Sequence, residues 1–299
     1  MQDFSNRVVV ITGAGSGIGQ ALAKELASRG AQLALADVNA VGLESTCGML
    51  GRAKTNSYVV DAADAAGMES FANSVRRDFG RASILVNNAG VALHGNFEEL
   101  SLADFEWLFR INFWGVIHGC KFFLPLLRQE PDARIVNISS VFGLIAPPGQ
   151  TAYGASKYAI RGFSESLREE LRGSSVGVTC VHPAGISTKI AMNARAGAAS
   201  NLQEQVLARE LFHRVARITP EEAAQTIVQG IVQQKDRVLI GADAYRMDRM
   251  ARLFPSRAGA MFAKWLSKRR AKFGQAPTAA KLELHGKDTD KAKAPPVRR

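Results

Sequence analysis

Residues 7–30, RVVVITGAGSGIGQALAKELASRG, decide the fold that this sequence predicts. The β-branched run at 7–12 is typical of a buried parallel strand, and the residues after the glycines have helical spacing up to Gly30, a helix stop. Between them stand four closely spaced glycines: Gly13, Gly15, Gly17 and Gly19. Glycines let backbone approach a pyrophosphate, and the N-terminus of the following helix faces its negative charge. The stretch therefore predicts a phosphate cradle.

An acidic residue closes the next strand. Residues 32–36 form an apolar run that ends at Asp37, about 20 residues after the glycines, where a carboxylate can accept hydrogen bonds from an adenosine ribose. The same carboxylate repels a 2′-phosphate, and no basic residue replaces Ser16 or follows Asp37 to attract one. We therefore expect NAD rather than NADP. The alternative is that Asp37 only caps the following helix.

Five further apolar runs alternate with helical stretches, at residues 55–60, 83–86, 133–138, 176–181 and 237–241. Alternating strands and helices predict an α/β fold of the doubly wound, Rossmann type: a seven-stranded parallel sheet with helices on both faces. Ligands bind such sheets at the carboxyl ends of the strands. Asp61, which follows one run, is expected either to bind the adenine amino group or to open the helix at 64–79.

Residues 140–157, SVFGLIAPPGQTAYGASK, carry the candidate chemistry. Tyr153 and Lys157 are four positions apart and would share one face of the helix expected at 151–172. A nearby ammonium favours phenolate and so is expected to lower the phenol's pKa toward neutral, where it can exchange a proton with a carbinol oxygen. Ser140, at the end of the strand 133–138, could hold the same oxygen.

Two asparagine-containing segments precede this stretch. The strand at 83–86 runs into Asn87, Asn88, Ala89 and Gly90, whose small residues would let backbone lie against a cofactor, although the amides could instead only brace the strand ends. Asn112 is a polar residue within the apolar helical stretch 102–128. Because buried amides need partners, it is either a helix-bending structural group or part of a proton relay.

From its N-terminus to about Gly241 the chain resembles the short-chain dehydrogenase/reductase family. The resemblance rests on Thr12-Gly13-x-x-x-Gly17-x-Gly19, Asn87-Asn88-Ala89-Gly90, Asn112, Ser140, Tyr153-x-x-x-Lys157 and Pro183-x-Gly185. It implies that Tyr153 is the acid/base, that Lys157 holds the nicotinamide ribose, that Ser140 positions the substrate oxygen, and that Asn112 anchors a water chain. The cofactor residues it implies are Gly13, Gly15, Ser16, Gly17, Ile18, Gly19, Asp37, Asp61, Ala62, Asn88, Ala89, Gly90, Tyr153, Lys157, Pro183, Gly185, Ile186 and Thr188.

The resemblance implies an enzyme that interconverts a secondary alcohol and a ketone by hydride transfer to or from NAD(P), with NAD favoured. Ala184 departs from the family's frequent second glycine but removes no chemistry. Residues 91–97, 141–150 and 189–215 are expected to line the substrate pocket. Their apolar side chains favour a hydrophobic alcohol or ketone, although a core-packing role is an equal alternative.

Composition excludes several other classes. The cysteines, Cys47, Cys120 and Cys180, and the five histidines are scattered, which predicts neither a metal site nor a disulfide framework. No apolar run approaches the roughly 20 residues of a membrane-spanning helix, and the N-terminus lacks the plan of a signal peptide. We therefore expect a cytoplasmic protein.

Positive charge gathers at the C-terminal end. Residues 264–299 contain 11 Lys/Arg and 3 Asp/Glu, so they hold +8 of the net charge of +11. The pattern predicts a catalytic domain at 1–241, an amphipathic helical extension at 242–273 and a disordered basic tail at 274–299. The extension is expected to cover the pocket or a neighbouring subunit, or to lie on a membrane surface.

Partners follow from these expectations. We expect a small-molecule substrate, no nucleic acid, and, by analogy with the family, a homodimer or homotetramer. The alternative functions are a catalytically silent protein that senses the dinucleotide, and a membrane-surface-binding protein that acts through the basic tail. The intact set of Ser140, Tyr153 and Lys157 argues against the silent protein.

Overall fold

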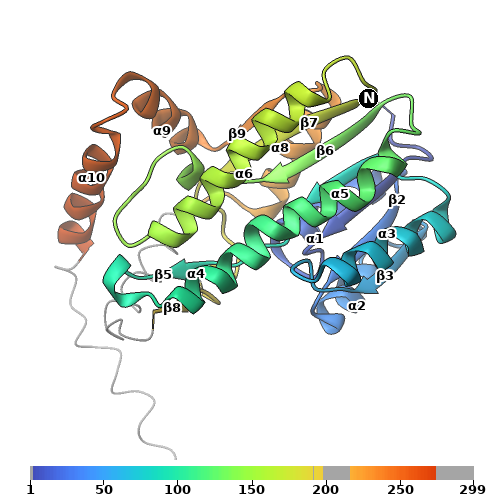
Figure 1. The fold of residues 1–299 in the computed structure, drawn as a ribbon, viewed down its shortest axis with the longest axis horizontal. Helices are drawn as coiled ribbons and strands as arrows, with labels where there is room; N and C mark the ends of the chain where they lie inside the picture. Colours follow the sequence, from blue (N-terminus) through green and yellow to red (C-terminus); the bar gives the residue numbers. More distant parts are fainter. Residues whose placement is uncertain (1–2, 191, 198–215, 274–299) are drawn as a thin grey trace, which may run out of the picture. The chain divides into compact units, whose positions relative to one another are not determined.

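The computed structural model describes residues 3–190, 192–197 and 216–273. It contains a seven-stranded, fully parallel sheet whose strands lie in the order β3-β2-β1-β4-β6-β7-β9 (Figure 1). The strands are β1 Val8–Thr12, β2 Gln32–Asp37, β3 Thr55–Val59, β4 Ile84–Asn87, β6 Ala133–Ile138, β7 Val176–Pro183 and β9 Arg237–Ile240. The predicted doubly wound α/β fold is confirmed. The strand order reverses between β1 and β4, which is where such sheets bind ligands.

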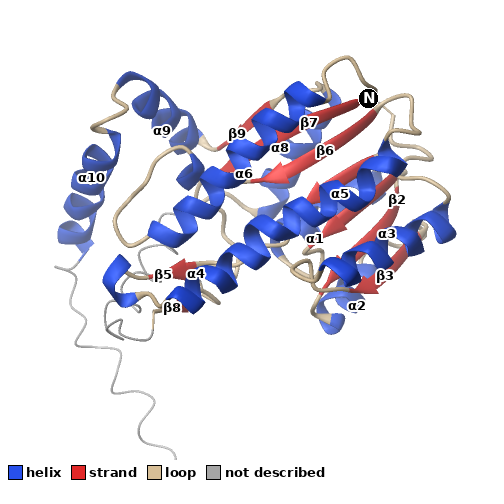
Figure 2. Cartoon of the chain, viewed as in Figure 1, coloured by secondary structure: helices blue, strands red, loops and turns tan. Residues whose placement is uncertain are grey.

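Helices cover both faces of the sheet (Figure 2). One buried core joins alternate residues of β1 and β2 to α1 Gly17–Ser28, α2 Ala40–Gly48 and α8 Pro220–Val232. The other joins the intervening residues to α3 Ala65–Phe79, α5 Gly115–Leu127 and α6 Thr151–Glu170. The central strands are therefore apolar on both sides, which explains why they read as continuous hydrophobic runs.

The long helix expected at 102–128 is interrupted. It consists of α4 Leu102–Phe109, a π-helical turn η2 at Arg110–Trp114, and α5. The turn contains Asn112, whose side chain bonds the backbone of Val91 on another segment. A π turn re-aims one side chain within a continuous helix and often occurs at functional sites.

Several elements were not predicted. Two-residue strands β5 Leu93–His94 and β8 Arg195–Ala196 form a separate small parallel sheet. α8 was also missed, and α2 was expected only as a helix after Asp37, without bounds. β7 extends two residues beyond the expected 176–181, so that it includes His182 and Pro183.

The C-terminal extension is helical, with α9 at Ala242–Leu253 and α10 at Ala258–Phe273. The chain separates into two compact units, residues 1–259 and 260–299, so α9 belongs to the first unit. The predicted tail at 274–299 and most of the predicted loop at 189–215 lie outside the described residues. Within the described part of the chain, no helix is both long and apolar enough to cross a membrane.

Candidate active site

The glycine turn after β1 is a tight backbone cradle. Gly13 and Gly17 have φ of 66° and 55°, in the left-handed region that favours glycine. A Cβ on Gly13 would lie 2.8 Å from the Cα of Ala89, so only glycine fits between the first and fourth strands. The side-chain amide of Asn88 donates to the carbonyls of Thr12 and Gly13, both at 3.0 Å. The predicted glycine and asparagine motifs thus meet at the switch point.

Asp37 lies beside this turn at the carboxyl end of β2. One carboxylate oxygen accepts from the backbone N–H of Gly15 at 2.8 Å, and the other accepts from Asn39 at 2.9 Å. The N-cap of α2 is Asn39, whose side chain accepts from Gly42 at 3.0 Å. Asp37 is therefore not the helix cap. It instead ties the end of β2 to the glycine turn.

The second helix braces the glycine turn, which sequence reasoning missed. The buried hydroxyl of Thr46 donates to the carbonyl of Ala14 at 2.9 Å. A Cβ on Gly42 would lie 2.7 Å from the carbonyl oxygen of Gly15, so α2 packs directly on the turn. These contacts join segments about 30 residues apart, and a polar residue within a short helix gives no periodic signal for them.

Ser140, Tyr153 and Lys157 lie close together in the structure. Ser140 and Tyr153 share a side-chain hydrogen bond, and the Ser140 oxygen also accepts from the N–H of Phe142 at 3.1 Å. The Nζ atom of Lys157 lies 5.7 Å from the centre of the Tyr153 ring and donates to the carbonyl of Ile138 at 3.1 Å. The helix α6 places Tyr153 and Lys157 on one face, and the end of β6 supplies Ser140.

Burial governs the ionisation of this group. It raises the pKa of the Tyr153 phenol above its ordinary value, and the hydrogen bond with Ser140 opposes that rise. It lowers the pKa of Lys157 to about 8, because a buried ammonium loses its hydration. The sequence predicts a Tyr153 pKa lowered by the charge of Lys157. In this structure burial raises the Tyr153 pKa instead, and the group that opposes the rise is Ser140.

Asn112 is fully buried and joins three segments. Its oxygen accepts from the N–H of Val91 at 2.8 Å, and its amide donates to the carbonyl of Val91 at 3.0 Å and to the hydroxyl of Ser156 at 3.2 Å. A Cβ on Gly90 would lie 3.2 Å from the Asn112 oxygen and 3.5 Å from Nζ of Lys157. Asn112 and Lys157 therefore both lie beside Gly90, the last residue of the predicted Asn-Asn-Ala-Gly segment.

The remaining predicted cofactor residues lie at the carboxyl ends of the strands or at the start of α1. Ser16 is the exposed N-cap of α1 and Ile18 is half-buried within its first turn. Thr188 approaches the glycine turn, since a Cβ on Gly17 would lie 3.2 Å from its methyl group. Pro183 is the last residue of β7, and Gly185, Ile186 and Thr188 follow it.

Three of the predicted residues have mainly structural contacts here. Asp61 accepts from the N–H of Ala63 at 2.9 Å, while Asp64 is the N-cap of α3. Ala62 is buried, and its carbonyl lies 3.0 Å from Nδ1 of His118. Ile186 is buried and pairs with the backbone at Ile218.

Of the residues expected to line the substrate pocket, some are buried in the core and others lie beside Tyr153. Leu144 and Ile145 are only 3% and 2% exposed, so they belong to the packed interior. Phe142 lies edge-on to the Tyr153 ring with centroids 6.3 Å apart. Tyr153 also packs on the small cluster that contains Leu93 of β5. The apolar surroundings of the phenol thus come from both sides of the site.

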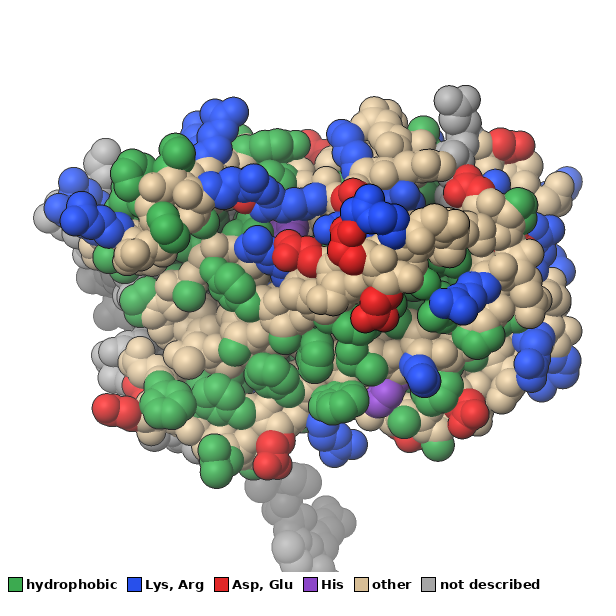
Figure 3. Space-filling model, turned by 45° about the horizontal axis from the view of Figure 1, so that its top comes forward, with side chains coloured by type: hydrophobic (Ala, Val, Ile, Leu, Met, Phe, Trp, Pro, Cys, Tyr) green, Lys and Arg blue, Asp and Glu red, His purple; other side chains and the backbone are tan. Residues whose placement is uncertain are grey.

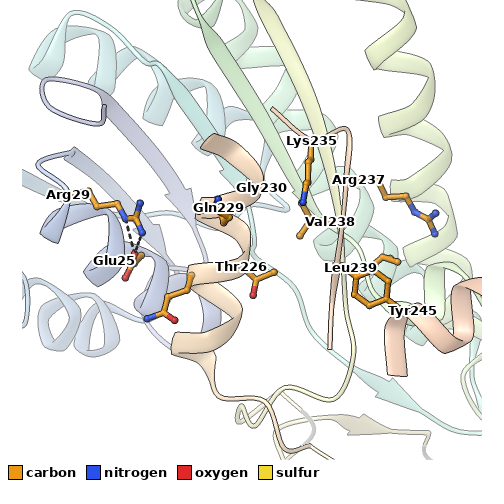
Figure 4. A pocket seen from close by; sticks show the side chains of 11 residues that line it. Glu25, Arg29, Thr226, Gln229, Gly230, Lys235, Arg237, Val238, Leu239 and Tyr245 are labelled. Carbon is orange, nitrogen blue, oxygen red and sulfur yellow. Dashed lines mark hydrogen bonds and ion pairs between the residues drawn. The ribbon is translucent and has the colours of Figure 1, made fainter. Parts of the chain in front are cut away.

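A separate hollow of about 450 Å³ lies along β9 and contains none of the predicted site residues (Figure 4). It runs between α1, α8 and the start of α9, and an ion pair of Glu25 and Arg29 stands at one side. Among the residues that the structure describes, no group of three or more His, Cys, Asp or Glu side chains is arranged to hold a metal ion.

Comparison with known proteins shows the family of this chain. The family model described as short chain dehydrogenase matches residues 7–199. The SadH protein of Mycobacterium tuberculosis, which carries an oxidoreductase name, is 44% identical over 261 residues, covering 86% of this chain and 94% of that protein. The D-threitol dehydrogenase of Mycolicibacterium smegmatis is 36% identical over 189 residues, covering 62% of this chain and 73% of that protein.

Solved structures share the fold. A short chain dehydrogenase/reductase from Burkholderia phymatum, solved in complex with NAD, superposes with a TM-score of 0.78 at 33% identity. The match covers 84% of this chain and 95% of that one. Levodione reductase superposes with a TM-score of 0.73 at 28% identity, over 81% of this chain and 99% of that one.

Proposed function

This chain belongs to the short-chain dehydrogenase family of oxidoreductases, and from that premise we propose that it interconverts a secondary alcohol and a ketone with NAD as redox partner. The observation that carries the proposal is the convergence of Ser140, Tyr153 and Lys157 beside the glycine turn. A bound dinucleotide would accept or supply the hydride, and the chain's own residues would position the substrate and move the proton.

The turn and the carboxylate of Asp37 fit an NAD molecule. The cradle is closed to any side chain at Gly13, and the oxygens of Asp37 already lie at its rim. A carboxylate in this position accepts from ribose hydroxyls and repels a 2′-phosphate. The NAD-bound Burkholderia phymatum structure supports the same assignment.

Each catalytic residue has a separate role in the proposal. The Tyr153 phenol gives its proton to the developing alkoxide during ketone reduction and takes it back from the alcohol in the reverse reaction. The Ser140 hydroxyl bonds both the phenol and the substrate oxygen, which keeps the two oxygens within proton-transfer distance. Lys157 is held against the sheet by the Ile138 carbonyl, from which it can reach a ribose hydroxyl. Asn112 keeps the segment beside Lys157 in place.

The test is a matched pair of tyrosine variants on one helix. Tyr153→Phe should abolish turnover of 2-octanol and 1-phenylethanol with NAD+ while NADH still binds, because only the proton-transferring oxygen is removed. Tyr158→Phe is the control, since Tyr158 is 38% exposed on the same helix and should leave turnover unchanged. Retained turnover in Tyr153→Phe contradicts the proposed role. Preference for NADP+ over NAD+ contradicts the proposed cofactor.

We also propose a peripheral contact between α9 and an anionic membrane surface, secondary to catalysis. Its outer face exposes Arg246, Arg249 and Arg252 beside Leu253, which is 71% exposed, and Phe254. Figure 3 shows that Lys and Arg side chains are interspersed with hydrophobic ones on this face of the molecule. This mixture suits an anionic bilayer. Sedimentation should find the protein with phosphatidylserine vesicles but not with phosphatidylcholine vesicles, and equal recovery from both contradicts the contact.

A further inference from the structure

His182 is a fully buried imidazole at the carboxyl end of β7. Its neighbour Val181 belongs to the core beneath α1 and α8, so the alternation of the strand turns His182 toward the opposite face of the sheet. There its Nδ1 atom lies 3.0 Å from the backbone carbonyl oxygen of Ser140, which follows β6. The His182 side chain thus joins the end of β7 to Ser140 at the end of β6.

The proton on this ring can be placed. Burial lowers the pKa of His182 to about 4, and the charges that also act on it are those of Arg161 on α6, Arg237 on β9 and Asp248 on α9. The ring is therefore neutral near pH 7 and carries one N–H. Because a carbonyl oxygen can only accept, that proton is on Nδ1. The Nε2 atom is then a bare acceptor, and it has no hydrogen-bond partner within the described part of the chain.

The Ser140 carbonyl is the centre of a small anchored turn. It accepts from Nδ1 of His182 and from the N–H of Gly143 at 2.9 Å, while the Ser140 hydroxyl accepts from the N–H of Phe142 at 3.1 Å. A buried acceptor without a partner destabilises a fold, so an apolar side chain would serve packing better than His182. The feature that an apolar side chain lacks is the Nδ1–H donor.

We propose that His182 is a positioning residue, whose Nδ1–H holds the Ser140 carbonyl and so directs the Ser140 hydroxyl toward Tyr153. The inference rests on the proposed function of Ser140 and Tyr153. Without the donor, the turn is held at this carbonyl by Gly143 alone, and the serine hydroxyl becomes free to leave the phenol. The reaction then slows, although the dinucleotide cradle is unchanged.

Three substitutions distinguish the Nδ1–H donor from the rest of the ring. In His182→Asn the side-chain amide nitrogen takes the place of Nδ1, and the unpaired Nε2 is removed. His182→Leu keeps similar bulk without a donor. His182→Gln places its amide near Nε2 and so has no donor at the Nδ1 position, and it is the second test variant should the leucine variant not fold. Loss of one hydrogen bond is worth about tenfold in rate, so His182→Leu should lower kcat about tenfold. His182→Asn should stay within about threefold of the wild type, and KM for NAD+ should not change.

The pH profile distinguishes positioning from general loosening. The hydrogen bond from Ser140 opposes the rise in the pKa of Tyr153, so a displaced serine should move the acidic limb of 2-octanol oxidation to higher pH. That shift is expected in His182→Leu and not in His182→Asn. Wild-type kcat and pH profile in His182→Leu overturn the proposal. Equal losses in the leucine and asparagine variants also overturn it, because the ring itself would then matter.

Hydrogen exchange provides a readout that needs no substrate. The amide of Gly143 bonds the Ser140 carbonyl, so exchange measured by mass spectrometry over residues 139–145 should quicken in His182→Leu but not in His182→Asn. NADH binding, followed by fluorescence, should be equal in all variants. If the wild type oxidises neither 2-octanol nor 1-phenylethanol, the proposed function is not supported with these substrates. Hydrogen exchange over residues 139–145 then still tests whether His182 holds the Ser140 carbonyl. Unchanged exchange in His182→Leu overturns it.

Discussion

Gly19→Ala tests whether the glycine turn requires a residue without a side chain at this position. The steric cost of the added Cβ is compared with the gain in helix propensity that alanine brings. Gly19 is the third residue of α1, and a Cβ there would lie 2.1 Å from the carbonyl oxygen of Gly13 and 2.6 Å from the amide nitrogen of Asn88. Unstrained contacts of this kind are near 3.5 Å, so the Cβ and the Gly13 oxygen must move apart by about 1.4 Å. Such overpacking costs about 1–3 kcal/mol, which exceeds the gain of at most about 1 kcal/mol from alanine in a helix.

The matched control is Gly162→Ala on α6. An added Cβ at Gly162 would meet nothing within 4 Å, so this variant keeps the helix-propensity gain without the overlap. Urea unfolding should show Gly19→Ala less stable by about 2 kcal/mol and Gly162→Ala more stable by up to about 1 kcal/mol. NADH titration by fluorescence should show at least about tenfold weaker binding only for Gly19→Ala, because its glycine turn moves.

The reasoning fails if Gly19→Ala binds NADH within twofold of the wild type and unfolds at the same urea concentration. The close approach of α1 to the glycine turn would then be relieved without cost. A loss of stability in Gly162→Ala would also count against it, since the effect at Gly19 could no longer be ascribed to the overlap.

Three further variants test the site. Asn112→Leu should lower the free energy of unfolding by about 3 kcal/mol, because the half-buried N–H and carbonyl of Val91 both lose their partner, and a loss under about 1 kcal/mol in urea would contradict this. Asp37→Ala should narrow the preference for NAD+ over NADP+ by about tenfold in kcat/KM, and an unchanged ratio would show that the carboxylate does not select the cofactor. Lys157→Met should be inactive yet more stable than the wild type at pH 7 without dinucleotide, by at most about 3 kcal/mol. The folded-state pKa of Lys157, about 8, lies below the ordinary 10.5, so between these pH values the unfolded chain binds more protons than the folded chain. The wild type should therefore gain stability as pH rises from about 8 to 10.5, and the difference in free energy of unfolding between it and Lys157→Met should shrink. A stability difference that grows with pH would contradict the lowered pKa of Lys157. Alcohol oxidation should also accelerate with rising pH into the alkaline range, because the pKa of Tyr153 is raised, and a rate independent of pH above 7 would argue against the phenol as base.

Much of the fold and of the candidate site could be predicted from the sequence because the signals are local. Continuous apolar runs such as Val8–Thr12 report strands buried on both faces, and the glycines after them report positive φ and close backbone approach. Tyr153 and Lys157 share a helix face through their spacing alone. Asp37 is placed by the length of the strand that ends at it.

The contacts that hold these groups in place could not be predicted in this way, because they join segments with no periodic relation. Thr46 bonds Ala14, Asn112 bonds Val91, and His182 bonds the Ser140 carbonyl 42 residues away. The π turn that aims Asn112 also depends on such a partner. A pattern of apolar residues reports which side of an element is buried and does not report which polar group it meets there.

The sequence by itself determined the order of the seven strands of the main sheet, the glycine cradle and the identities of the serine, tyrosine and lysine, since each follows from neighbouring residues. Only the tertiary structure decided the direction of their ionisation. Desolvation depends on everything that packs over a group, and here that packing raises the pKa of Tyr153 and lowers that of Lys157, against the direction expected for the phenol from the lysine's charge alone.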